Sequence, residues 1–376
     1  MRWMLAIVLV ATPAFAGKRG KRGKPEPEPV PVQAPEPQVP PIEGLFAPLS
    51  LVTLGALPEG LANASAQGCA ACHPATVHRW RSGPHGQAPS DAFLAALEAE
   101  GNPTCGTCHW PLASQQPLSF TPALAAPPPT TPAAGFDGTL RAEGVTCAAC
   151  HIREGAIVAA SPGPHAAPHP VRHGPELASG EVCRSCHQLE RDGVALYDTY
   201  GEWSRSAYAA AEVGCLDCHG GAGPDGRGAT DHQLVIDGMQ PVSLLVELDG
   251  DRVVRGGDPL EVRLTLQNTG AGHHWPSGGP WSGARLDAAL VLDTDDGPTR
   301  AAPFAVDLHR RFDDRWQIVE DTRLAAGTSQ EHTWRPALPQ DAPAGAWRLD
   351  ITLTPTARGQ VSGEPTVHFV LPLGSD

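Results

Sequence analysis

Hydrophobic and polar residues follow different patterns in the two halves of the chain. From about residue 241 onward, apolar residues alternate with polar ones, most clearly over 260–266, 286–292 and 347–353. Alternation with a period of two is typical of half-buried β-strands. About seven or eight such strands, separated by Gly- and Asp-containing turns, predict an antiparallel β-sandwich of immunoglobulin-like type over 241–376.

The first 42 residues do not have the pattern of a folded domain. Arg2 is followed by an apolar run over 3–11 and then by Ala14-Phe15-Ala16, a small-residue cleavage site. Residues 1–16 are therefore expected to be a secretory signal peptide, and the protein to be periplasmic or otherwise exported. The alternative is an uncleaved membrane anchor, for which the apolar run is short. Residues 17–42 are rich in Pro and Glu and predict an extended linker.

Residues 43–240 contain all ten cysteines and little regular structure. Helices are expected only over 90–100 and 199–211, with Pro-rich loops between the cysteines. This domain is therefore predicted to be mostly helical or irregular. Large aromatic residues are few, so side chains alone would make a thin core and another group must fill the interior.

The chemistry of this domain is indicated by a Cys-x-x-Cys-His motif that occurs five times. Two thiols at this spacing can form thioethers with the two vinyl groups of one haem, and the following histidine can bind its iron. The motifs are Cys69-Cys72-His73, Cys105-Cys108-His109, Cys147-Cys150-His151, Cys183-Cys186-His187 and Cys215-Cys218-His219.

Three other uses of paired cysteines compete with haem attachment. Disulfides occur in exported proteins, zinc ribbons use C-x-x-C pairs, and thioredoxin-like proteins use them for redox chemistry. None of these needs a histidine directly after every second cysteine. The sequence therefore predicts five covalently attached haem c groups, whose apolar rings would also form the core of a haem-packed domain.

Most of these haems are expected to have two histidine ligands, because Met239 is the only methionine beyond the signal peptide. Bis-histidine ligation implies low reduction potentials. For each candidate for the second, distal ligand of a haem iron, the alternative is a histidine side chain in solvent. The candidates are His85, which follows Trp80 by five residues, His232, which follows the fifth motif, one or more of His165, His169 and His173, and His273 in a Gly/Pro-rich turn. His309, His332 and His368 are taken as ordinary histidines of the β-domain.

Four stretches of the chain resemble a known group of proteins. They are residues 143–151, 169–171, 200–208 and 272–278. They resemble the multihaem cytochromes c related to the tetrahaem electron acceptor of hydroxylamine oxidoreductase, in the variant with a C-terminal β-domain. The resemblance implies closely packed bis-histidine haems and periplasmic electron transfer, and it favours His169 over its neighbours and His273 over His274. The chain departs from the family in two places. The family has W-x-x-S-x-H near the first haem, whereas here the serine before His85 is shifted to Ser82, and residues 237–240 stand where the family has Gly-Gly-His.

The function expected from these features is electron transfer between redox partner proteins, without catalytic residues. The net charge of −14 does not suggest nucleic acid as a partner, and membrane association is not expected beyond the signal peptide. The alternative is a multihaem oxidoreductase acting on a small nitrogen or sulfur compound at a five-coordinate haem. Pentahaem nitrite reductases use a lysine as the proximal ligand of that haem, and this chain has no lysine after Lys24. The β-domain could additionally dock the cytochrome to a partner.

Overall fold

The computed structural model describes residues 5–7, 50–90, 106–122, 129–160, 168–221, 230–235, 241–249, 260–294, 297–337 and 347–373. The chain forms two compact units. The β unit comprises Met1–Ala11, Cys186–Gly214 and Gly238–Asp376, and the helical unit comprises Thr12–Ser185 and Cys215–Asp237.

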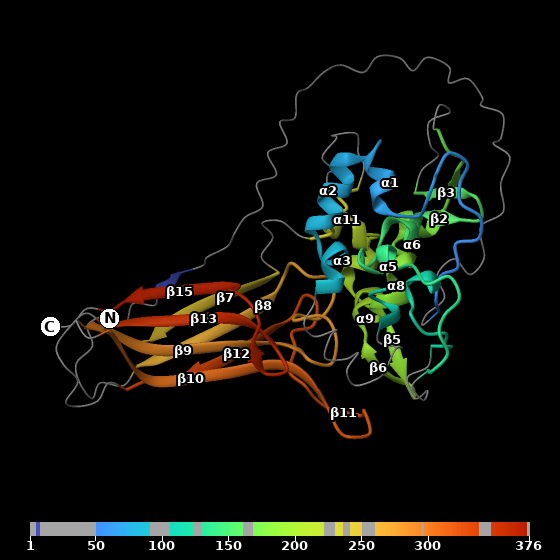
Figure 1. Ribbon diagram of the computed structural model, residues 1–376. Coiled ribbons are helices and arrows are strands. Elements are labelled where there is room, and N and C mark those ends of the chain that lie inside the picture. Colours follow the sequence, from blue (N-terminus) through green and yellow to red (C-terminus); the bar gives the residue numbers. More distant parts are fainter. Residues whose placement is uncertain are drawn as a thin grey trace, which may run out of the picture. The chain divides into compact units, whose positions relative to one another are not determined.

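The described residues of the β unit form two large antiparallel sheets and a small two-stranded one, β5-β6 (Figure 1). In the first sheet the strand order is β1-β7-β8-β12. In the second it is β11-β10-β9-β13-β14, and β15 also pairs with β13. The strands are β1 (Leu5–Ile7), β7 (Val242–Asp249), β8 (Glu261–Asn268), β9 (Ser282–Thr294), β10 (Gly297–Phe312), β11 (Ile318–Asp321), β12 (Ser329–Trp334), β13 (Trp347–Ala357), β14 (Gln360–Val361) and β15 (Val367–Pro372).

The two sheets share one apolar core. Every second residue of β8 is buried, as the alternating sequence pattern predicts. Leu264 of β8, Leu290 of β9 and Ile351 of β13 are fully buried in the same cluster, so side chains from both sheets meet there. Burial of each such side chain stabilises the fold by about 1.5–3 kcal/mol. The expected antiparallel strands are confirmed, and the immunoglobulin-like type of the sandwich stays a prediction.

Residues 186–214 pack with these strands, whereas the sequence-based boundary at 240 assigns them to the cysteine-rich domain. Long-range hydrogen bonds explain the difference. The Arg310 guanidinium donates to the backbone oxygen of Leu196, and the Tyr208 hydroxyl donates to the backbone oxygen of Thr269 at 2.7 Å. This segment contains the hairpin β5 (Leu189–Arg191) and β6 (Val194–Tyr197) and the helices α9 (Thr199–Ser204) and α10 (Ala207–Ala210).

The single helix expected over 199–211 is instead the two short helices α9 and α10. The Ser206 side chain accepts a hydrogen bond from the Ala209 N–H at 3.4 Å and so caps the start of α10. A serine that caps a new helix interrupts the preceding one.

The described residues of the helical unit form short helices and one small sheet. The helices are α1 (Ala66–Ala70), α2 (Pro74–Ser82), α3 (Pro84–Gln87), η1 (Ala88–Ser90), η3 (Ala113–Gln115), α5 (Gly138–Arg141), α6 (Cys147–His151), α7 (Pro175–Ser179), α8 (Glu181–His187) and α11 (Cys215–His219). The last two residues of α8 belong to the β unit. The sheet has the order β2 (Ile152–Arg153), β3 (Ala156–Ala159) and β4 (Val171–His173). Most of the helix expected over 90–100 lies outside the described residues.

The apolar interior of the helical unit is divided into three small clusters. Ala66, Val77 and Trp80 form one of them, with Cys69 and Cys147 packed against it. A second surrounds Leu112 and Ile152, and a third joins Val158 and Leu177. These clusters fit the expectation of a thin core of side chains. Within the described residues, none of the helices combines the length and the apolar character needed to span a bilayer.

Candidate haem attachment site

The described residues of the five motifs lie on helical turns. The third motif forms α6, the fifth forms α11 and the fourth lies within α8. The first begins in α1, and the His73 N–H donates to the Cys69 oxygen at 2.8 Å, which continues the turn to the histidine. In the second, the His109 N–H donates to the Gly106 oxygen at 3.1 Å, and Cys105 lies outside the described residues.

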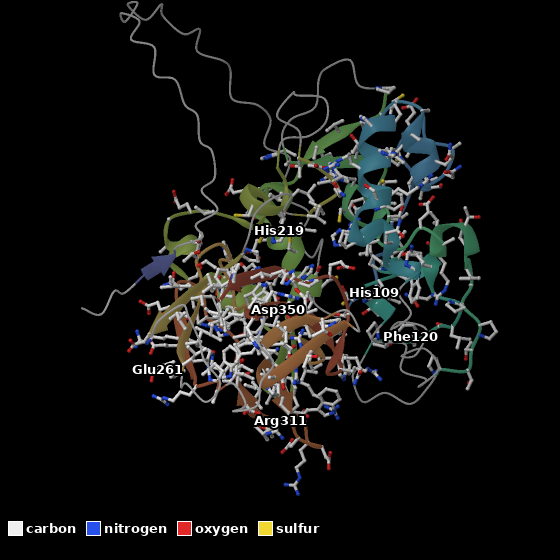
Figure 2. The ribbon with its side chains drawn as sticks, turned by 90° about the vertical axis from the view of Figure 1, so that its left-hand side faces the viewer. His109, Phe120, His219, Glu261, Arg311 and Asp350 are labelled. Carbon is white, nitrogen blue, oxygen red and sulfur yellow. The ribbon has the colours of Figure 1, made fainter. Side chains whose placement is uncertain are left out.

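A helical turn gives this motif the geometry that haem attachment requires. Positions i, i+3 and i+4 lie on one face of a helix, so both thiols and the following imidazole project to the same side. Figure 2 labels His109 and His219, which end the second and fifth motifs in the helical unit. The nine described cysteines are all free of disulfides, and they are Cys69, Cys72, Cys108, Cys147, Cys150, Cys183, Cys186, Cys215 and Cys218.

Cysteines from different motifs lie next to one another. The thiols of Cys69 and Cys147 are hydrogen bonded, and this bond lowers the pKa of Cys69 to about 7 and raises the pKa of Cys147. The thiols of Cys183 and Cys215 are also hydrogen bonded, which lowers the pKa of Cys215 to about 7. The fold therefore places the first motif beside the third and the fourth beside the fifth. A thiolate is the nucleophilic form of cysteine, so this form is favoured in Cys69 and Cys215 and disfavoured in Cys147.

Glu143 connects the first and third motifs. Its carboxylate accepts hydrogen bonds from the Ala66 N–H at 3.0 and 3.1 Å and from the Thr146 hydroxyl at 2.6 Å. Ala66 begins α1 and Thr146 directly precedes α6. This carboxylate therefore joins the starts of two motif-bearing helices, which gives a physical role to the first residue of the stretch 143–151.

The hydrogen bonds of several histidines select the nitrogen that can bind a metal. The Nδ1 atom lies 2.7 Å from the Val158 oxygen in His151, 2.8 Å from the Thr230 oxygen in His232 and 3.0 Å from the His274 oxygen in His273. When Nδ1–H donates to a carbonyl oxygen, the lone pair remains on Nε2 and the imidazole is oriented as metal ligands usually are. This arrangement favours a lone pair on Nε2 in these three side chains, and their role as metal ligands stays a prediction.

Burial keeps several of the candidate ligands neutral. It lowers the pKa of His85, with a further contribution from the charge of His109, and it also lowers the pKa values of His151 and His232. A neutral imidazole is the form that binds a metal. Within the described chain, the Nδ1 atom of His169 is buried and has no hydrogen-bond partner. Its surroundings leave this atom unsatisfied, which fits a side chain that binds an additional group.

Two other histidines differ from these candidates. The Nε2 atom of His173 lies 3.0 Å from the Ala160 oxygen and the side chain is exposed, so the nitrogen that commonly binds haem is engaged. Nδ1 of His274 lies 3.5 Å from the Glu202 carboxylate and 3.4 Å from the Arg323 guanidinium. The preference for His169 over its neighbours and for His273 over His274 stays a prediction. His165 and Met239 lie outside the described residues.

The structure brings some candidates together. The imidazole rings of His151 and His232 have centroids 5.9 Å apart, and His85 lies close enough to His109 for the two charges to interact. Among the described residues, no group of three or more His, Cys, Asp or Glu side chains could hold a metal ion. A haem iron takes its four equatorial ligands from the porphyrin and needs only axial ligands from the protein.

The sequence alone did not identify the charged residues that contact the backbone of His274 and the loop of His232. Glu202 accepts a hydrogen bond from the His274 N–H at 3.1 Å, and Arg79 pairs with Asp231, next to His232. The position of Glu202 in the stretch 200–208 and that of Asp231 before a candidate ligand were the available signals. Neither signal identifies the partner residue. Arg323, which pairs with Glu202, and Arg79, which pairs with Asp231, are distant from these partners in the sequence.

Comparisons with known proteins show the fold. No protein-family model matches the chain, and no curated protein matches it. Among solved structures, a penta-haem cytochrome c552 from Thermochromatium tepidum is similar over 82% of this chain and 98% of its own, with a TM-score of 0.59 and 16% sequence identity. The CARDB domain of a Pyrococcus furiosus protein has a TM-score of only 0.21 at 14% identity, over 34% of this chain and 84% of its own. The chain thus has a fold similar to that of a multihaem cytochrome c, whereas the relation to the electron acceptor of hydroxylamine oxidoreductase stays a prediction.

Proposed function

We propose that this chain is an exported c-type cytochrome that carries five haems and transfers electrons between redox partner proteins. The observation that carries the proposal is the recurrence of Cys-x-x-Cys-His on short helical turns, in a fold similar to that of a penta-haem cytochrome. Bound haem supplies one-electron chemistry at its iron.

The residues of each motif would divide the work of holding one haem. The two thiols fix the edge of the ring, and the histidine binds one face of the iron. The carbonyl oxygen of Val158 orients His151 through its Nδ1 atom, and such second-shell bonds also raise the basicity of the ligand. The fifteen motif residues named above would hold the five haems in this way.

The adjacent thiol pairs support electron transfer between haems. Cys69 beside Cys147 and Cys183 beside Cys215 place attachment points of different motifs in direct contact. Haems attached at adjacent points are held near each other whatever the exact ring orientation, and close approach is what a chain of haems needs to pass electrons.

The distal ligands proposed are His85, His169, His232 and His273, so most haems would be bis-histidine ligated and low in potential. The test is a spectroelectrochemical titration of the protein purified from a host with cytochrome c maturation. We expect five one-electron steps per chain. Fewer than five steps would contradict the proposed haem content.

Export is the second part of the proposal. Cleavage after Ala16 would remove β1, which pairs with β7 in the full chain. We expect the protein isolated from a periplasmic fraction to begin at Gly17, which N-terminal sequencing would check. An intact residue 1 in membrane fractions would instead support the anchor.

A further inference from the structure

We propose that His232 is the distal ligand of the haem attached at Cys147 and Cys150, opposite His151, and that Arg79, Asp231 and Gly83 hold it in position. The inference rests on the proposed haem binding and goes beyond it by pairing one distal histidine with one haem.

The first support is the distance between the two imidazoles. Their ring centroids are 5.9 Å apart and their planes are inclined by 39°. Two metal–imidazole bonds of about 2 Å each, plus about 1 Å from each nitrogen to its own ring centroid, place the centroids of two axial imidazoles roughly 6 Å apart. The pair therefore has the separation that one iron between the rings requires.

The second support is that both rings leave the same nitrogen available. Nδ1 of His151 lies 2.7 Å from the Val158 oxygen, and Nδ1 of His232 lies 2.8 Å from the Thr230 oxygen. Both imidazoles can thus offer Nε2 to one iron. Each carbonyl oxygen belongs to the backbone near its own histidine, so the two rings are oriented independently of each other.

The third support is an ion pair that fixes the loop of His232 to α2. Nε of Arg79 lies 3.0 and 3.1 Å from the two carboxylate oxygens of Asp231, and its Nη2 atom also contacts this carboxylate. The same carboxylate accepts the Gln233 N–H at 3.0 Å. Bidentate pairing gives geometric specificity as well as energy. Asp231 is therefore anchored on one side of His232, and its own side chain orders the backbone on the other.

The fourth support is a close backbone approach at the end of α2. A Cβ atom at Gly83 would overlap the backbone oxygen of Gln233 and lie within 3.0 Å of its Cα atom. The φ angle of Gly83 is −93°, which any residue adopts, so the close approach and not the conformation requires glycine here. Arg79 of α2 and Gly83, which directly follows α2, thus contact the residues on either side of His232.

The competing assignment gives His232 to a different haem. His73 of the first motif is near enough for its charge to lower the pKa values of both His151 and His232, and the fifth motif precedes His232 in the sequence. The experiment must therefore identify which haem loses its distal ligand, and not only show that one haem has lost a ligand.

The test uses the full chain with its haems and reads the spin state of the oxidised irons by electron paramagnetic resonance. The His232→Ala variant should keep five haems and lose one low-spin haem, and the reduced form should bind one carbon monoxide per chain. In the four-haem variant Cys147→Ala/Cys150→Ala, adding His232→Ala should convert none of the four remaining low-spin haems. If one of the four remaining low-spin haems is lost, His232 serves another haem and the assignment is wrong.

The positioning role of Arg79 and Gly83 is tested separately. Arg79→Met and Gly83→Ala should each convert part of the same haem to high spin, and neither should add to the effect of His232→Ala. Arg81 is exposed on the same helix, so Arg81→Met is the matched control and should retain the wild-type spectrum. An unchanged spectrum in both Arg79→Met and Gly83→Ala would overturn the positioning role.

A second measurement covers the case in which the four-haem variant does not accumulate. In crystals of the wild-type protein, anomalous scattering at the iron edge would locate the irons. The iron bonded to Nε2 of His151 should also be bonded to Nε2 of His232. Any other distal ligand on that iron overturns the assignment. A wild-type protein with fewer than five haems would contradict the proposed function instead, so the two failures are distinguishable.

Discussion

The carboxylate of Glu202 lies 2.7 Å from the guanidinium of Arg323, and both side chains are almost completely buried, with exposed fractions of 2% and 5%. Arg323 also contacts the carboxylate of Asp321 at 2.8 and 2.9 Å. Glu202 in turn accepts the His274 N–H. The pair therefore joins α9 to the turn that carries His273, within the β unit.

Breaking this ion pair should destabilise the β unit. Arg323→Met leaves the buried Glu202 carboxylate without its cationic partner, and such a change costs about 3–5 kcal/mol. Chemical denaturation followed by circular dichroism would measure the loss. Arg335→Met is the control, because its pair with Glu261, labelled in Figure 2, is exposed and such pairs contribute about 0–1 kcal/mol. Equal losses in the buried and exposed variants would show that the Glu202–Arg323 pair contributes little.

His273→Ala should convert one low-spin haem to high spin, whereas His274→Ala should not. The reason is that Nδ1 of His273 lies 3.0 Å from the His274 oxygen, which orients the ring as metal-binding imidazoles usually are, while His274 contacts Glu202 and Arg323. The Asn268 side chain further holds the turn by donating to the His273 oxygen at 2.9 Å. Electron paramagnetic resonance of the oxidised variants checks this prediction. If all haems keep their spin state in His273→Ala, the β unit is better regarded as a docking module.

His332 on β12 should make the β unit sensitive to acid. Burial lowers its pKa below the ordinary value of 6.5, and its Nε2 atom is buried with no hydrogen-bond partner among the described residues. The unfolded chain therefore binds a proton more readily than the folded one, so the free energy of unfolding falls as the pH drops below 6.5 toward the lower folded-state pKa.

The measurement compares the wild type with His332→Gln, which cannot titrate. Thermal unfolding midpoints would be recorded from about pH 7.5 down to about pH 5. The midpoint of the wild type should fall more steeply than that of the variant. Parallel curves would mean that His332 does not contribute to the acid sensitivity.

The reduced protein should not turn over nitrite, hydroxylamine or sulfite. Catalysis would need a five-coordinate haem, and the lysine that serves as proximal ligand in pentahaem nitrite reductases is absent after Lys24. Stopped-flow absorbance of the reduced haems with each substrate would detect turnover. Sustained turnover at rates on the order of ten per second would favour the oxidoreductase alternative.

The sequence predicts those parts of the structure that depend on local patterns. Alternating apolar residues predict β8, β9 and β13, and the motif spacing places thiols and imidazoles on helical turns. The contacts that anchor the candidate ligands are not local. Arg79 and Asp231 are 152 positions apart and Glu202 and Arg323 are 121 apart, and no periodicity encodes such a pairing. The same reason explains why the boundary at 240 missed the contacts of residues 186–214 with the strands.

The measurement that tests the central claim most directly is the number of haems bound covalently to the purified chain. Acid-acetone extraction followed by a pyridine haemochrome assay, together with the intact mass, should show five haems per chain that cannot be extracted. Variants that replace both cysteines of one motif should each lose one haem. Extractable haem, or fewer than five bound haems in the wild type, would contradict the account.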